Sequence, residues 1–135
     1  MKNFELSQDM LNMRGQFYPT GCIVAMFPSA DAAKAAARAL ADAGVGEEDI
    51  SFITPDVMLR DIVRTVGSAD IPLPSPGTES DTVRRYAQFA SQGHHALLIR
   101  GENSDVDNDL VMRALREHQV SHAQKYRKLV IEDLA

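Results

Sequence analysis

The chain has 135 residues and a net charge of −5 at pH 7, with 44% hydrophobic and 24% charged residues. This length is typical of one domain, and the composition excludes an intrinsically disordered chain and an integral membrane protein. The acidic balance argues against a binder of duplex DNA, because such proteins neutralise phosphates with basic side chains. The single cysteine, Cys22, excludes an internal disulfide and a multi-cysteine zinc site.

The first 19 residues predict an N-terminal arm that packs on the body of the protein or on a partner chain, followed by one α+β domain over residues 20–135. Within the arm, Leu6, Met10 and Met13 have helical spacing and permit a short helix. Acidic and polar residues interrupt the apolar ones, so the pattern of a signal peptide is absent and we expect a cytoplasmic protein.

A strand–helix–strand unit follows the arm. Residues 21–27 form a continuous apolar run between two prolines, which is typical of a strand buried on both faces. Ser29 predicts the N-cap of an alanine-rich helix that ends at Gly44. Residues 50–53 predict the second strand.

The rest of the chain alternates between helical and extended patterns. The expected elements are a helix at 56–66, a proline-rich loop at 67–79, a helix at 80–93, a strand at 94–100, an acidic loop at 102–109, a helix at 110–118 and a strand at 122–132. Because prolines deny the loop ladder hydrogen bonds, we predict that it is the most mobile internal segment and borders any ligand cleft.

We predict no metal and no cofactor. Residues 105–109 alternate oxygen ligands like a calcium loop, but Leu110 and Arg116 stand where an EF-hand needs glycine and glutamate. Acids also gather where a helix begins, because its N-terminus favours negative charge. A zinc site needs three or four converging ligands, and such spacing is absent among the four histidines: His94, His95, His118 and His122.

Candidate catalytic residues are few. Cys22 lies in an apolar strand, where burial disfavours the thiolate that a nucleophile needs, so we interpret it as structural. His94 and His95 are candidates for a general acid or base. As neighbours on a strand they point to opposite faces, and at most one can join a given site.

Candidate ligand-binding residues are Tyr86, Arg100, Tyr126 and Arg127. Tyr126 interleaves with bases near the C-terminus, a pattern found on RNA-binding and anion-binding surfaces. The bases are Arg113, Arg116, Lys125, Arg127 and Lys128. We favour the alternative that these cations compensate the acidic loop and a helix C-terminus.

Two blocks resemble the small bacterial general-stress-protein domain. The first runs from Gly21 to Thr54: a strand, an alanine-rich helix, a glycine with an acidic turn, and the strand Ile50-Ser51-Phe52-Ile53. The second has Tyr86 in a helix, then Gly93 and the strand Ala96-Leu97-Leu98-Ile99. The resemblance implies a bacterial protein with a ferredoxin-like α+β domain and no established chemistry, and it transfers no functional residue.

The predicted architecture is therefore a two-layer ferredoxin-like sandwich, with a four-stranded sheet backed by helices. Both faces of the first strand are apolar, with Cys22, Val24 and Met26 on one and Ile23, Ala25 and Phe27 on the other. Helices of this fold cover one face, so we predict a homodimer or higher oligomer that covers the second. Alternatively, the arm folds over that face or the helix at 56–66 crosses to it.

For function, these observations favour a non-enzymatic, stress-related or regulatory domain that acts by self-association and by binding a partner protein or a small anionic ligand. The alternative is a small enzyme with a cleft near the proline-rich loop, using His94 or His95 as general acid or base.

Overall fold

The structure, a computed structural model, describes residues 1–11, 17–66, 78–100, 108–126 and 131–134. An open mixed sheet lies at its centre, in the strand order β1-β3-β4-β2-β5, with β6 paired along the outer side of β5. The strands are β1 (Lys2–Asn3), β2 (Cys22–Phe27), β3 (Ile50–Ile53), β4 (His95–Arg100), β5 (His122–Tyr126) and β6 (Ile131–Asp133). β1 runs parallel to β3, and every other described pair is antiparallel.

The helices are α1 (Ala30–Asp42), α2 (Pro55–Val57), α3 (Thr78–Ser91) and α4 (Asn108–Glu117). α2 is one turn that continues as a π-helical segment, Met58–Ile62, and then as a 3-10 turn, Val63–Val66. Two further 3-10 turns lie at Gln8–Met10 and Glu47–Asp49.

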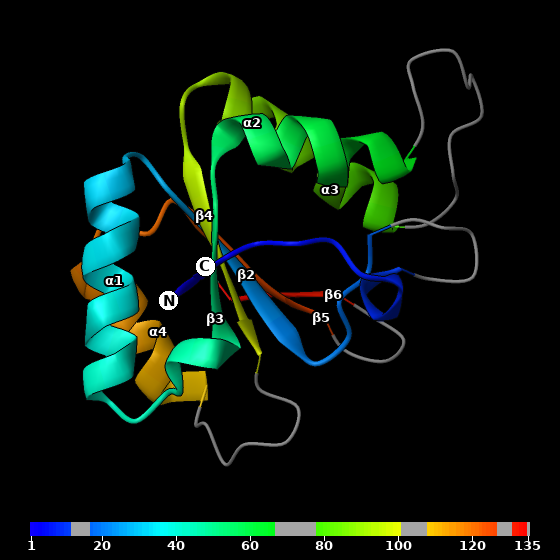
Figure 1. Cartoon of the computed structure of the whole chain (residues 1–135). Helices are drawn as coiled ribbons and strands as arrows, with labels where there is room; N and C mark the ends of the chain where they lie inside the picture. The colour runs from blue at the N-terminus through cyan, green and yellow to red at the C-terminus, as the bar shows by residue number, and fades with distance from the viewer. Residues whose placement is uncertain (12–16, 67–77, 101–107, 127–130, 135) are drawn as a thin grey trace.

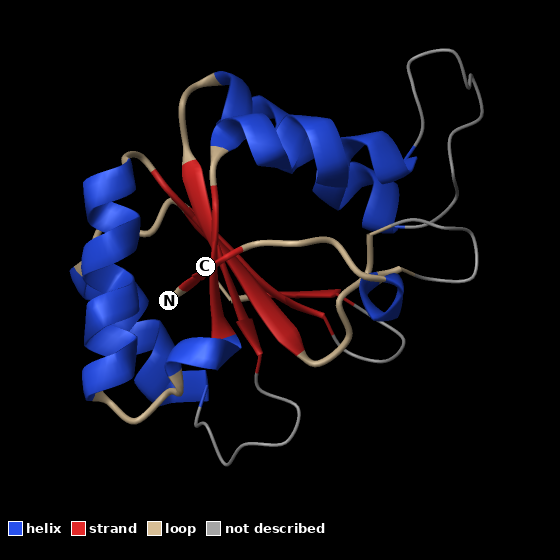
Figure 2. Cartoon of the chain, viewed as in Figure 1, coloured by secondary structure: helices blue, strands red, loops and turns tan. Residues whose placement is uncertain are grey.

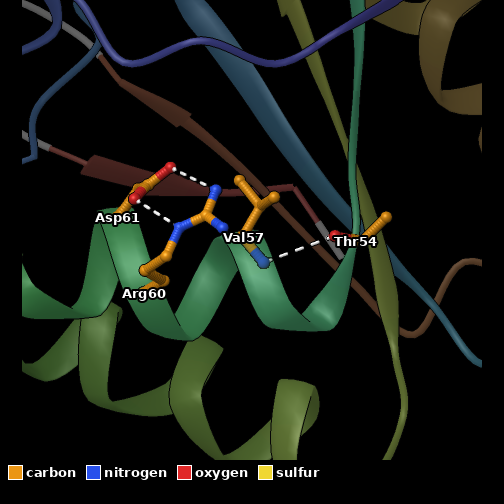
Figure 3. Close-up of polar contacts among 4 residues, drawn as sticks. All are labelled: Thr54, Val57, Arg60 and Asp61. Atoms are coloured by element: carbon orange, nitrogen blue, oxygen red, sulfur yellow. Dashed lines mark hydrogen bonds and ion pairs between the residues drawn. The ribbon is translucent and has the colours of Figure 1, made fainter.

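Hydroxyl side chains start two of these helices. The Ser29 hydroxyl accepts a hydrogen bond from the Ala32 N–H (3.1 Å) at the start of α1. In the same way, the Thr54 hydroxyl accepts from the Val57 N–H (3.3 Å) at α2 (Figure 3). Each hydroxyl satisfies a donor that the first helical turn leaves unpaired. On the π-helical segment, the neighbouring side chains of Arg60 and Asp61 pair with each other (3.0 Å; Figure 3).

Helices cover both faces of the sheet (Figures 1 and 2). α1 and α4 pack on one face, and α2, its π-helical continuation and α3 lie across the other. The prediction of two layers and four strands is therefore wrong, because the structure has three layers and a wider sheet. The physical reason is that inner strands with two apolar faces must be covered on both. The segment expected as a helix at 56–66 lies across the second face, as the alternative to an oligomer in the sequence analysis proposed.

The N-terminal arm adds to the cover of the second face. Phe4, Met10 and Phe17 are buried there together with Val24 and Met26 of β2. The backbone N–H of Phe4 also donates to the Phe52 carbonyl (3.0 Å), which extends the pairing of β1 with β3. One chain covers both faces of the sheet, so the argument for a homo-oligomer from an uncovered apolar face no longer applies. The homo-oligomer stays a prediction.

The structure also differs from the prediction at the C-terminal strand and in the N-terminal arm. The strand expected at 122–132 is two antiparallel strands, β5 and β6, with Tyr126 opposite Ile131. The helix expected in the arm is a single 3-10 turn, and Met13 lies outside the described residues. Residues 67–77 and 101–107, which hold most of the proline-rich and acidic loops, also lie outside them. In the described part of the chain, every helix is too short or too polar to cross a membrane.

Candidate functional site

A small pocket lies where the arm meets the end of the sheet at which β2 begins and β4 ends. It has a volume of about 110 Å³ and is lined by Asp9, Met10, Pro19, Thr20, Cys22 and Arg100. Since liquid water takes about 30 Å³ per molecule, this space holds about four water-sized groups. The pocket therefore fits a very small molecule, well below the size of a typical cofactor.

The sheet contributes Cys22 and Arg100 to the pocket. These residues are direct cross-strand partners, Cys22 at the start of β2 and Arg100 at the end of β4. Cys22 is buried, and its Sγ lies 3.9 Å from the Thr20 carbonyl oxygen. The Arg100 side chain keeps 34% of its surface exposed, so its guanidinium can be reached from solvent.

The arm contributes Asp9 from a firmly held turn. Met10, the next residue, is buried in the core. Its N–H donates to the Ser7 carbonyl (3.0 Å), and its own carbonyl accepts from the Tyr18 N–H (2.7 Å). These contacts fix the backbone that presents the Asp9 carboxylate to the pocket.

An ion pair joins the two sides of the pocket. Arg100 Nη2 lies 3.5 Å from Asp9 Oδ2, and the Asp9 side chain is 65% exposed. The Ser7 hydroxyl donates a hydrogen bond to Asp9 Oδ1. That hydrogen bond first, and the charge of Arg100 less strongly, hold the pKa of Asp9 below its ordinary value of 3.8. Asp9 is therefore ionised at neutral pH, but an exposed pair of this length contributes little to stability.

A buried tyrosine pair lies on the face of the sheet that the arm and α3 cover. The hydroxyl oxygens of Tyr86 and Tyr126 are 2.9 Å apart, and Tyr86 also donates to Gln124 Oε1 (3.2 Å). Both tyrosines are fully buried, and Gln124 nearly so. The structure thus brings together two predicted ligand-binding residues, from α3 and β5. Their hydrogen bonds satisfy polar groups inside the core, which is a structural role.

The burial of Tyr126 has a consequence for nucleic-acid binding. A base can stack only on an exposed ring, and the Tyr126 ring packs instead against the rings of Phe17 and Tyr18, at 5.9 and 5.0 Å between centroids. Tyr126 is therefore not part of an RNA-binding surface. Arg127, the fourth predicted ligand-binding residue, lies outside the described residues.

His94 and His95 lie on opposite faces of the sheet, as predicted. The His95 ring stacks on Phe52 (5.5 Å) on the side of α1, and its Nδ1 lies 3.2 Å from the Gly93 carbonyl oxygen. The His94 ring contacts Phe89 (5.0 Å) on the side of α3. Within the described ranges, neither imidazole forms an ion pair or hydrogen bond with a carboxylate.

The described residues offer no metal site. Among the residues that the structure describes, no group of three or more histidine, cysteine and acidic side chains could hold a metal ion. Comparison of the chain with protein families, curated proteins and solved structures finds no match.

Sequence reasoning named Arg100 but missed Asp9 and the pocket. Asp9 lies in a polar stretch of the arm, and its role depends on a contact with a residue 91 positions later in the chain (100 − 9). The one available signal was the buried anchor beside it, since Met10 belongs to the apolar set of the arm. The apolar pattern of the arm predicts that the arm packs on the body, but it does not predict which end of the sheet the arm contacts.

Proposed function

We propose that the protein is a non-enzymatic regulatory domain that binds a small anionic ligand in the pocket between its arm and its sheet. One observation carries this proposal: Arg100 lies at a pocket of about 110 Å³, where it forms a 3.5 Å pair with the exposed Asp9. A guanidinium presents paired N–H donors that match a carboxylate or a similar anion.

The size and lining of the pocket restrict the ligand. A space of about 110 Å³ fits a carboxylate with two or three carbons, because bonded atoms take less volume each than separate water molecules. Met10 and Pro19 offer apolar contacts to such a carbon chain, and Thr20 offers a hydroxyl. The ligand would touch both the arm and the sheet, so its binding would change how tightly the arm is held. This coupling favours a regulatory role.

The enzymatic alternative gains no support from the described residues. A general acid or base is usually oriented by a second polar group beside the reacting centre. His94 and His95 instead contact aromatic rings on opposite faces of the sheet. The cleft expected near the proline-rich loop falls on residues 67–77, outside the described residues.

The strand order supports a ferredoxin-like assignment of the central sheet. The antiparallel order β5-β2-β4-β3, with α1 after β2 and α4 before β5, is that of the βαββαβ motif. The segment from α2 to α3 would then be an insertion between the second and third strands of the motif, laid across its open face. A relation to general-stress proteins is part of this proposal and rests on the two sequence blocks alone.

Isothermal titration calorimetry with acetate, propionate and glycolate tests the proposed function. We expect the wild-type protein to bind at least one of them, and the Arg100→Gln variant to bind it about tenfold more weakly or worse, because a charge-assisted hydrogen bond is lost. Arg38→Gln, an exposed arginine on α1, is the matched control and should bind like wild type. Unchanged affinity in Arg100→Gln, or no binding at millimolar concentration, would refute the proposal.

A further inference from the structure

We infer that the ligand is a small zwitterion, an α-amino acid no larger than alanine, with its carboxylate on Arg100 and its ammonium group on Asp9. This inference rests on the proposed function and names the ligand class for the same pocket. It follows from the fact that the pocket presents both a cation and an anion to its contents.

The negative charge of Asp9 favours a zwitterion over a simple anion as the ligand of Arg100. Asp9 Oδ2 lies 3.5 Å from Arg100 Nη2, so an anion bound to Arg100 alone would bring a second negative charge beside the Asp9 carboxylate. Like charges at this distance repel, and the repulsion is stronger near a protein surface than in bulk water. An α-amino acid separates its opposite charges by one carbon, so it can replace the single ion pair with two.

The construction of the pocket fits this exchange. Asp9 is presented by a turn that the buried Met10 anchors, so the carboxylate stays at the pocket when its partner changes. The Ser7 hydrogen bond and the Arg100 charge lower the pKa of Asp9, which keeps it anionic and able to attract an ammonium group. The exposed fractions of 65% for Asp9 and 34% for Arg100 leave both groups accessible to an entering ligand.

Volume sets the upper limit on the side chain of the amino acid. A space of about 110 Å³ is of the size of glycine or alanine, because bonded atoms take less volume each than separate water molecules. The remaining apolar lining, Met10 and Pro19, would contact the α-carbon or a methyl group. Phenylalanine carries the same charged groups, but its side chain exceeds this space, so weaker binding of phenylalanine than of alanine separates size from charge.

The test is calorimetry of glycine, alanine, acetate, methylammonium and phenylalanine against wild type and the variants Asp9→Asn, Arg100→Gln and Asp42→Asn. We expect glycine or alanine to bind wild type about tenfold more tightly than acetate, as a second charged contact would give. Asp9→Asn should remove this preference while acetate still binds, and Arg100→Gln should weaken both ligands. Asp42→Asn, an exposed acid at the end of α1, should leave all affinities unchanged.

The possible results separate this inference from the proposed function. Equal affinities for glycine and acetate in wild type, unchanged in Asp9→Asn, would overturn the zwitterion and leave the anion site standing. Tight binding of phenylalanine would overturn the size limit. Absence of binding by every compound would overturn both proposals. Circular dichroism of Asp9→Asn checks that this isosteric variant keeps its fold, so that a lost preference can be assigned to the charge.

Discussion

The carboxylate of Asp9 joins the arm to the sheet, because it pairs with Arg100 from the end of β4. The hydrogen bond from the Ser7 hydroxyl orients this carboxylate and stabilises its charged form. A single side chain of the arm thus depends on one local partner and one distant partner. Their separate contributions can be measured at this residue.

The first prediction concerns the titration of Asp9. Its pKa in the folded protein lies below 3.8, so its stabilising contribution is present above that pH and is lost as the pH falls through the folded value. We expect Ser7→Ala and Arg100→Gln each to raise the pKa of Asp9, because each removes a group that stabilises the charged carboxylate. Carbon-detected NMR of the Asp9 carboxyl measures each midpoint. A wild-type midpoint at or above 3.8 would contradict the prediction.

The second prediction concerns the buried tyrosine pair. Tyr86→Phe and Tyr126→Phe each remove a hydroxyl from a contact of 2.9 Å, and each should lower the free energy of unfolding by about 1–3 kcal/mol. The double variant should lose less than the sum, with a coupling of about 0.5–1.5 kcal/mol between the two hydroxyls. Urea unfolding of the four proteins gives this coupling. A value of zero would show that the hydroxyls do not interact in solution.

The N-terminal arm packs as part of the core. Phe17 is fully buried and packs edge-to-face against the rings of Phe4 and Tyr126, at 6.3 and 5.9 Å between centroids. The arm therefore completes the layer that α3 and the π-helical segment begin. Its loss would uncover the same apolar side chains from which an oligomer was predicted.

The third prediction tests this role of the arm. Phe17→Ala should lower the free energy of unfolding by about 3–5 kcal/mol, as expected for a large aromatic side chain removed from a packed core. Leu59→Ala, at a position that is 40% exposed, is the control and should change stability by about 0.5 kcal/mol or less. Chemical denaturation of both variants measures these changes in the free energy of unfolding. Equal effects would mean that the arm is not docked as the structure describes.

The elements of the domain were largely predictable because local signals set their limits. Ser29 caps α1, and Gly44 follows it with φ of +105°, a conformation that favours glycine. The apolar run of β2 was equally clear, since all six of its residues are buried. β1 was missed, and β6 was merged with β5 into one predicted strand. Two or three residues carry no periodicity, and they form a strand only where a neighbouring strand supplies hydrogen bonds.

The site was predictable only in part. Tyr86 and Tyr126 were named, but their contact joins α3 to β5 across the sheet, and that pairing depends on which face α3 covers. The sequence shows that both faces are apolar without saying which helix crosses to which face. Asp9 was missed for the same reason, since its partner is set by the path of the arm.

A single chain covers both faces of its sheet with its own helices and arm. The homodimer remains a prediction, and its interface would lie away from these faces, for example along the outer strand β6. Light scattering after size exclusion tests it: a mass twice the 14.8 kDa of one chain supports the dimer. A species of 14.8 kDa at micromolar concentration would reject it without affecting the pocket.

The proposed binding of a small ligand between arm and sheet is tested most directly by a ¹H–¹⁵N NMR titration of the whole chain with acetate and with glycine. We predict saturable shifts that are largest for the amides of Asp9, Met10, Thr20, Cys22 and Arg100, which line the pocket. Amides of α1 and α4, on the far face of the sheet, should barely move. Shifts that do not saturate, or that centre on α1, α4 or the His95–Phe52 contact, would contradict the proposal.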